Sequence, residues 1–357
     1  MGAALALAER GRGRTTPNPN VGCVLVKEAL VVGRGWTQPG GRPHAEAVAL
    51  AQAGDKSRGA TCHVTLEPCA HRSERGPACS DLLVKAGVAR VVAALEDPDP
   101  RTAGRGFARL RDAGVDVVVG PEAEAARRVM AGFLTRRVWR RPHVTLKLAT
   151  SLDGRIATAS GESRWITGPE ARAHAHLERS RCEAILVGRG TWEADRPRLD
   201  VRLAGLEGRS PVRVVLSSRH LVEDKPSSAQ CDLRSGRGMD PSLRWDDGNE
   251  WDGVNMIASP HGIAELPGDH LLIEGGAGAA AAFLRADLVD RLLLYRAPIL
   301  IGPGLSALGD IGLASLGPAH GRWRLHDARA LGRDRLEVYE RDPCSPGSSA
   351  TWGGSTR

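Results

Sequence analysis

The strongest constraint on the fold is an alternation of strand-like and helix-like segments over the first 140 residues. Runs rich in Val, Ile and Leu predict strands at 21–26, 30–33, 61–66, 90–95 and 115–120. Helical segments are predicted at 2–10, 44–53, 78–87, 104–113 and 122–138. Strands followed by helical crossovers are typical of an α/β/α sandwich with a largely parallel sheet. Only three residues join the first two strands, so we expect them to form a hairpin.

The alternation starts again with a strand at 143–149, and a chain of 357 residues is long enough for two domains. We expect one domain at 1–142, a second at 143–340 and a disordered tail at 341–357. Residues 219–262 have no periodicity and predict a long surface excursion. Further elements of the second half are predicted as strands at 183–188, 212–217, 270–276 and 289–300 and a helix at 277–285.

Four residues of the first half have the types and order of a zinc-binding deaminase site. His44 follows Pro43, a residue favoured in the first helical turn, and Glu46 comes two positions later. Cys69 follows a proline, and Cys79 lies ten positions further on. Taken singly, such a His is usually a surface or capping residue, and such a Cys is usually a buried small hydrophobe. Together they match the arrangement in which one imidazole and two thiolates hold zinc and leave one position for water.

The chemistry of deamination explains why these residue types are needed. Zinc lowers the pKa of its water to about 7, which provides a nucleophile for a ring carbon that bears an amino group. Ammonia leaves only after protons reach it, and a carboxylate that stays off the metal can move them. We expect Glu46 to have this role. Nucleic-acid deaminases place two residues between their cysteines, whereas nine separate Cys69 from Cys79.

The charge of the chain favours phosphorylated small ligands over nucleic acid. The formal net charge is +7, and only five of the 49 Lys and Arg residues are lysine. Aromatic residues make up 4% of the chain, too few for the base-stacking platforms of single-stranded nucleic-acid binders. Seven cysteines, an odd number, indicate a reducing compartment, and no apolar stretch is long enough to span a membrane. We expect a cytoplasmic protein with no nucleic-acid or membrane partner.

Five segments of the first half resemble the deaminase domain of the bifunctional riboflavin-biosynthesis deaminase/reductase family. They are "TTPNPNVGCVLV", "PHAEAVAL", "VTLEPCAH", "LVKAGVARVVAALEDPDP" and "GRGFARLRDAGVDV". The resemblance implies a cytidine-deaminase-like α/β/α sandwich with one Zn²⁺ per chain. His44, Cys69 and Cys79 would be its ligands and Glu46 its catalytic proton shuttle. Asn18 or Asn20 would meet the pyrimidine, and His71 would be a loop residue near the substrate or a spare ligand.

The second half resembles the reductase domain of the same family through "LKLATSLDGRIATASGESRWIT", "LERSRCEAILVGRGTWEADRPRLDVR" and "LLIEGGAGAAAAFL". This implies a dihydrofolate-reductase-like α/β fold, NADPH as cofactor and a homo-oligomer. Guanidinium groups suit a ribose 5-phosphate. The implied substrate-binding residues are Ser163, Arg179, Leu199, Arg202 and Glu274. The implied cofactor-binding residues are Ala149, Trp165, Thr191, Asp195, Ser218, Gly276, Ala277, Gly278, Ala279, Ala280, Ala281 and Ala282.

The function that the resemblance implies has two steps on a phosphorylated pyrimidine substrate. The first is zinc-dependent hydrolytic deamination of 2,5-diamino-6-(ribosylamino)pyrimidin-4-one 5′-phosphate, and the second is NADPH-dependent reduction of its ribosyl chain. Departures from the family pattern leave alternatives open. The segment between the cysteines is one residue longer than the family pattern, and Arg196 and Asp200 stand where the family tends to have Asp and Thr. One half could therefore have lost catalysis, leaving for example a reductase with a vestigial deaminase domain. A nucleic-acid-editing deaminase is the other alternative.

The remaining histidines and cysteines receive structural interpretations. His174 and His176 show no evident partner in the sequence, and we expect both to be exposed. Cys23 and Cys62 lie in predicted strands and are expected in the core.

Overall fold

The computed structural model describes residues 1–71, 76–217 and 253–341. The chain forms two compact units, Met1–His143 and Val144–Arg357. The predicted tail, 341–357, lies outside the described residues except for Arg341, which ends a strand. Within the described ranges, every helix is too short or too polar to cross a membrane.

The first unit contains one five-stranded sheet in the order β2-β1-β3-β4-β5. β1 and β2 form the predicted hairpin, and β1 also pairs antiparallel with β3. The β3–β4 and β4–β5 pairs are parallel, so outside the predicted hairpin the expectation of a largely parallel sheet is wrong for the β1–β3 pair alone. The strands are β1 Gly22–Lys27, β2 Leu30–Trp36, β3 Thr61–Val64, β4 Arg90–Ala93 and β5 Asp116–Val119. The helices are α1 Gly2–Ala8, α2 Ala45–Ala53, α3 Cys79–Lys85, α4 Arg105–Asp112, α5 Ala123–Val129 and α6 Ala131–Trp139.

Helices α1 and α2 cover opposite faces of this sheet. A Cβ added to Gly22 would lie 1.9 Å from the carbonyl oxygen of Ala4 in α1, and one added to Gly35 would lie 2.0 Å from that of Ala45 in α2. Gly35 pairs with Cys23, the neighbour of Gly22, and successive residues of a strand face opposite ways. The two glycines therefore allow a helix to approach closely on each side, as the α/β/α sandwich requires.

The helix predicted over 122–138 is two helices. Met130, with φ −101° and ψ 18°, leaves the helical region between α5 and α6. Its side chain is fully buried among the core residues of the first unit. No proline marks the break, and the apolar periodicity of the sequence continues across it. The sequence therefore predicts one helix where the structure has two.

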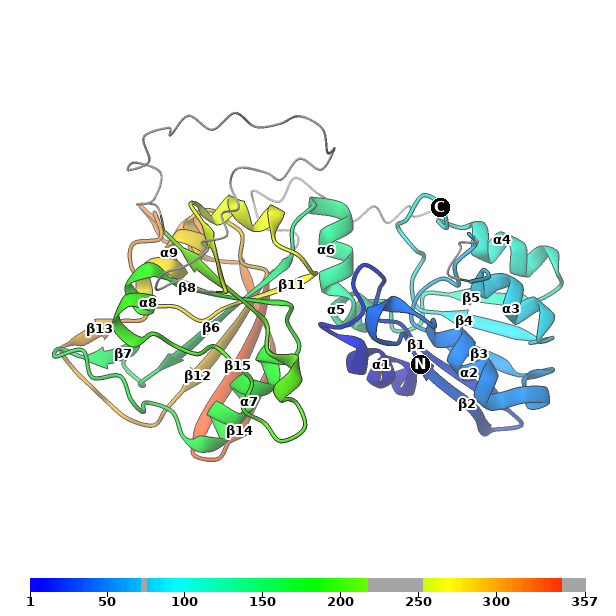
Figure 1. Cartoon of the computed structure of the whole chain (residues 1–357), viewed down its shortest axis with the longest axis horizontal. Helices are drawn as coiled ribbons and strands as arrows, with labels where there is room; N and C mark the ends of the chain where they lie inside the picture. The colour runs from blue at the N-terminus through cyan, green and yellow to red at the C-terminus, as the bar shows by residue number, and fades with distance from the viewer. Residues whose placement is uncertain (72–75, 218–252, 342–357) are drawn as a thin grey trace. The chain divides into compact units, whose positions relative to one another are not determined.

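The second unit is built on an eight-stranded sheet in the order β10-β9-β8-β11-β6-β12-β15-β14 (Figure 1). The pairs β10–β9, β9–β8, β8–β11 and β6–β12 are parallel, whereas β12–β15 and β15–β14 are antiparallel. The strands are β6 His143–Thr150, β8 Ala184–Gly188, β9 Val212–Leu216, β10 Val254–Ile257, β11 His270–Ile273, β12 Arg291–Arg296, β14 Trp323–Leu331 and β15 Asp334–Arg341. β7 Arg155–Thr158 and β13 Gly304–Ser306 form a separate antiparallel pair.

Strand β10 corrects the interpretation of 219–262 as a surface excursion. Its residues, 254–257, pair with β9 and extend the central sheet. Val254 and Ile257 are buried, so this part of the segment contributes to the core. The stretch 219–252 lies outside the described residues.

The helices of the second unit also lie on both faces of its sheet. α9 Ala277–Arg285 packs in a cluster with Leu292 and Leu294 of β12. α7 Pro169–Arg179 packs in another cluster with Leu293 and Tyr295. Since neighbouring residues of a strand face opposite sides, α7 and α9 sandwich the sheet. The segment after β11 and the helix after β8 meet through Gly276 and Thr191 at the carboxyl ends of these strands, where ligands of open α/β sheets usually bind.

Candidate active sites

Three side chains of the first unit converge in one cluster that could hold a metal. His44 is the N-cap of α2, Cys69 lies in the loop after β3, and Cys79 is the first residue of α3. Nδ1 of His44 lies 3.3 Å from Sγ of Cys79 and 3.7 Å from Sγ of Cys69. The three ligand atoms all lie within 4.8 Å of one another. Donors around a tetrahedral zinc ion are separated by about 3.5 Å, so this set fits zinc.

The longer segment between the cysteines does not displace Cys79 from the cluster. The backbone N–H of Cys79 donates to Sγ of Cys69 at 3.3 Å, and Ser80 donates through its hydroxyl to the carbonyl of Cys69. The hydrogen bond between the two thiols lowers the pKa of Cys69 to about 4, with His44 adding to the effect, and raises that of Cys79. The start of α3 thus fixes one cysteine against the other, while residues 72–75 lie outside the described ranges.

Glu46 lies beside the cluster without belonging to it. It is in the first turn of α2, two residues after His44, and 3% of its surface is exposed. Burial raises the pKa of Glu46 to about 7, although the positive charge of His44 opposes this. A carboxyl group with a pKa near 7 can both take up and release protons at neutral pH.

His44 and Cys69 of the cluster, together with Glu46, line a cavity of about 240 Å³. Asn18 lines this cavity and contacts His44, whereas Asn20 is buried elsewhere and donates to the carbonyls of Ala8 and Val129. His71 also lines it and contacts Thr102 but is not in the metal cluster. Other charged residues on its walls, not singled out from the sequence, are Arg42, Glu67, Asp97, Asp99, Arg101 and Arg137.

Glu67 organises the wall of the cavity opposite α2. Its carboxylate accepts four backbone hydrogen bonds, from Asp97, Gly104, Gly106 and Phe107, at 2.8–3.2 Å. Three of these N–H groups belong to the start of α4, where a helix leaves its donors unsatisfied. One buried side chain therefore ties α4 and the loop of Asp97 to the loop after β3, which carries Cys69.

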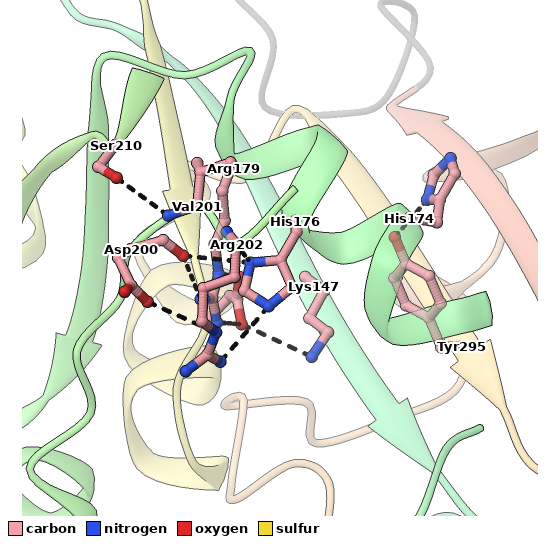
Figure 2. Close-up of polar contacts among 10 residues, drawn as sticks. Lys147, His174, His176, Arg179, Asp200, Val201, Arg202, Ser210 and Tyr295 are labelled. Atoms are coloured by element: carbon pink, nitrogen blue, oxygen red, sulfur yellow. Dashed lines mark hydrogen bonds and ion pairs between the residues drawn. The ribbon is translucent and has the colours of Figure 1, made fainter. Parts of the chain in front are cut away.

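The second site lies at the carboxyl ends of β6 and β11. Arg179, the last residue of α7, donates from Nε and Nη2 to the two oxygens of Glu274, at 2.7 and 2.9 Å. Nζ of Lys147 in β6 lies 3.7 Å from the same carboxylate and 5.7 Å from the ring centre of Tyr295 (Figure 2). Burial alone would raise the pKa of Glu274. The neighbouring positive charges of Lys147 and Arg179 outweigh this effect and lower the pKa to about 2.

Lys147 is a residue of this site that the sequence analysis did not single out. The signal that could have found it is a charged side chain within the apolar strand "HVTLKLAT". A lysine there needs a partner, because an unpaired buried charge is costly.

The prediction that His174 and His176 are exposed is wrong. Nδ1 of His174 lies 2.7 Å from the hydroxyl of the buried Tyr295. Nδ1 of His176 lies 3.1 Å from the carbonyl oxygen of Asp200. Both partners are distant in sequence, so no local pattern could reveal them (Figure 2).

The predicted cofactor residues gather around the start of α9. The backbone N–H of Gly276, its N-cap, donates to the hydroxyl of Thr191 at 3.1 Å, which joins helix α8 Arg189–Asp195 to the start of α9. Ala279, Ala280 and Ala281 are buried against the sheet, whereas Gly278 is exposed. The first turn of α9, from Ala277, therefore offers mainly backbone N–H groups.

The other predicted residues of this site are more dispersed. The side chain of Trp165 is 64% exposed, with the guanidinium of Arg172 4.6 Å from its ring centre. Oδ1 of Asp195 lies 3.5 Å from Nη2 of Arg164, the residue that follows Ser163 in the sequence. Ala149 is near the end of β6, and Ala282 continues α9 behind its first turn. Ser218 lies outside the described residues.

The fold and the two sites define a two-domain protein that joins a zinc-binding deaminase domain to a reductase domain. Residues 1–95 match the cytidine and deoxycytidylate deaminase zinc-binding region, and residues 142–238 and 261–336 match the RibD C-terminal domain. The chain belongs to the RibD family of riboflavin-biosynthesis proteins. Its two halves therefore have the predicted cytidine-deaminase-like and dihydrofolate-reductase-like folds.

Two relatives and two solved structures illustrate this similarity. The RibD protein of Escherichia coli is 42% identical over 87% of this chain and 92% of its own, and that of Aquifex aeolicus is 37% identical over 96% and 97%. RibD of Acinetobacter baumannii superposes with a TM-score of 0.77 at 35% identity. A diaminohydroxyphosphoribosylaminopyrimidine deaminase/5-amino-6-(5-phosphoribosylamino)uracil reductase of Thermotoga maritima does so with 0.78 at 30%. Each structure matches 96% of this chain and 97% of its own.

Proposed function

We propose that this chain catalyses two successive steps of riboflavin biosynthesis. The first unit removes, by hydrolysis, the 2-amino group of 2,5-diamino-6-(ribosylamino)pyrimidin-4-one 5′-phosphate. The second unit reduces the ribosyl chain of the product to ribityl with NADPH. The observation that carries the proposal is the cluster of His44, Cys69 and Cys79 beside Glu46, at a cavity lined by His44, Cys69 and Glu46, in a chain that also has the reductase domain.

In the first step the chain supplies metal ligands, a proton carrier and a cavity beside them. Zinc held by His44, Cys69 and Cys79 would activate water at neutral pH. Glu46, with its pKa near 7, would carry one proton from the attacking water to the ring nitrogen and then a second from the newly added hydroxyl to the departing amino group. Asn18 lies beside His44 on the cavity wall and is placed to meet a polar edge of the pyrimidine.

In the second step the chain positions the sugar against the cofactor. NADPH supplies the hydride, which is chemistry that belongs to the cofactor. The first turn of α9 and Thr191 present backbone and hydroxyl donors suited to a cofactor phosphate. Arg202 is half-exposed at the rim, while Arg179, Glu274 and Lys147 form a charged group deeper in the site. Arg202 suits the phosphate of the sugar, and the deeper charged group suits its hydroxyls.

The proposal is tested with the purified full chain and the diamino substrate. We expect ammonia release without NADPH, followed by NADPH oxidation once the cofactor is added. Glu46→Gln should slow ammonia release about 10²–10⁴-fold while the deaminated compound is still reduced. Arg202→Ala should impair only the reduction. If the wild type reduces the deaminated compound but releases no ammonia, the deaminase half is vestigial and the first step of the proposal fails.

We also propose a homo-oligomer in the cytoplasm, as the resemblance implies. Light scattering of the purified chain tests the assembly. A monomer at micromolar concentration would contradict it.

A further inference from the structure

The segment that carries Leu199 and Arg202 has a backbone that its neighbours must hold in place. Leu199 has φ 53°, in the left-handed region that is costly for a branched side chain, yet only 3% of its surface is exposed. The N–H of Val201 donates to the hydroxyl of Ser210 at 3.0 Å. The segment therefore depends on contacts from outside itself.

Helix α7 supplies two of these contacts to a single carbonyl group. Nη1 of Arg179 donates to the carbonyl oxygen of Asp200 at 2.9 Å, and Nδ1 of His176 lies 3.1 Å from the same oxygen. Residues three apart lie on one face of a helix, so both side chains reach the segment together. Figure 2 shows both around Asp200.

His176 also contacts the side chain of Arg202. Its Nε2 lies 3.4 Å from Nη2 of Arg202, while the backbone N of Arg202 lies 3.2 Å from Nδ1. With the proton on Nδ1, the neutral ring donates to the carbonyl of Asp200 and Nε2 accepts from the guanidinium; with the proton on Nε2, Nδ1 instead accepts from the backbone N–H of Arg202, so the ring contacts the Arg202 segment in either form. Burial, with the positive charges of Arg179 and Arg202, lowers the pKa of His176 and so favours a neutral ring.

The contact orients a guanidinium that is still available to a ligand. The side chain of Arg202 is 52% exposed, and its Nε lies 3.7 Å from Oδ1 of Asp200. Within the described part of the chain, Nη1 of Arg202 makes no hydrogen bond. His176 thus contacts one side of the guanidinium and leaves Nη1 open to an anion.

We propose that His176 is a positioning residue of the reductase site, which holds Arg202 in the orientation that receives the phosphate of the sugar substrate. This rests on the proposed function, because it takes the ligand of Arg202 to be a phosphorylated ribose. His176 itself does not touch the reacting atoms. Its loss should therefore weaken substrate binding and leave the hydride step intact.

The test is steady-state kinetics of NADPH oxidation by the full-length protein. His176→Ala should raise KM for the deaminated substrate about five- to tenfold, the loss of roughly one ordinary hydrogen bond, with kcat and KM for NADPH unchanged. His176→Gln, whose amide oxygen can accept from Arg202, should restore KM to within about twofold. In an Arg202→Ala background, His176→Ala should have little further effect, because His176 acts through Arg202.

The matched control is His174→Ala, which removes an imidazole from the same helix but contacts Tyr295 instead of the segment. It should leave KM for the substrate within about twofold of the wild type. Equal effects of the two alanine variants, or a His176→Ala effect on kcat and on KM for NADPH, would show a structural role only and overturn the proposal.

A binding measurement separates this inference from the proposed function. If the wild type does not oxidise NADPH with the deaminated substrate, the proposed reduction fails, and calorimetric titration with ribose 5-phosphate decides the role of His176. Weaker binding to His176→Ala than to the wild type supports the positioning role. Equal binding to both proteins, or binding to neither, overturns it.

Discussion

Glu274 and Arg179 form a two-pronged ion pair, with Nε of the arginine 2.7 Å from one carboxylate oxygen and Nη2 2.9 Å from the other. The side chains are 10% and 13% exposed. The resemblance assigns each residue separately to the substrate, but in the structure each is the main partner of the other. Their pairing ties the end of α7 to the end of β11, 95 residues apart in sequence.

Replacing Arg179 with Met should destabilise the second unit strongly. The carboxylate of Glu274 would remain buried with only Lys147 near it, and breaking a buried pair on one side costs about 3–5 kcal/mol. Chemical unfolding of the full chain at pH 7 measures the change. Arg90→Met, which breaks the exposed pair with Asp116, is the control and should cost at most about 1 kcal/mol. Similar losses for both variants would contradict this account.

The stabilisation by Glu274 should depend on pH in the acidic range. Its pKa is lowered from 4.5 to about 2 in the folded protein. A carboxylate whose pKa falls on folding contributes stability that is fully present above its unfolded pKa and is lost as the pH falls through its folded pKa. The difference in unfolding free energy between wild type and Glu274→Gln should therefore be constant above about pH 5 and shrink towards pH 2. Parallel stability profiles across that range would contradict the assignment.

Glu67→Gln should destabilise the first unit without touching the metal ligands. The amide has one accepting oxygen in place of two, so two of the four backbone donors lose their acceptor. A buried donor without an acceptor costs about 1–3 kcal/mol, so we expect a loss of about 2–5 kcal/mol. Thermal unfolding measures it, with zinc content as a second readout. An unchanged melting temperature would mean that the carboxylate is not needed as a helix cap.

The sequence predicts the elements and the metal cluster because both leave local patterns. The β1–β2 hairpin and helix α9 lie where periodicity predicts them. The residue types of His44, Cys69 and Cys79, and their order in the chain, are enough to predict that the three side chains form a cluster. The partners of His176 and the four donors to Glu67 follow from no such pattern. Each of these contacts joins segments 24 or more residues apart, whose meeting depends on strand order.

Strand order is the part of the fold that periodicity does not contain. A run of buried residues has the same pattern in a parallel pair and in an antiparallel pair, so periodicity alone does not reveal that β1 and β3 pair antiparallel. The break at Met130 escapes detection for a similar reason, because its buried side chain continues the apolar stripe of the helix.

Cys79→Ala should remove the metal from the purified protein. The wild type should hold about one zinc per chain, and the variant should lose most of it together with ammonia release. Cys62→Ala is the matched control: Cys62 is equally buried but lies 3.5 Å from Cys23 and is not in the cluster, so zinc should be retained. Zinc retained in Cys79→Ala would instead indicate a different ligand, with His71 on the same cavity as the first candidate.

Asp200→Thr should tighten binding of the phosphorylated sugar in the reductase site. The carboxylate of Asp200 lies 2.8 Å from Nη2 of Arg198 and 3.7 Å from Nε of Arg202, so it competes with a phosphate for Arg202 and repels it. Exposed ion pairs are worth at most about 1 kcal/mol, so KM for the substrate should fall about two- to fivefold. KM for NADPH is the internal control and should not change. Asp200→Asn, which keeps the shape and removes the charge, should have the same effect. A rise in KM in both variants would mean that the carboxylate holds the two arginines in their binding positions, and the competition would be excluded.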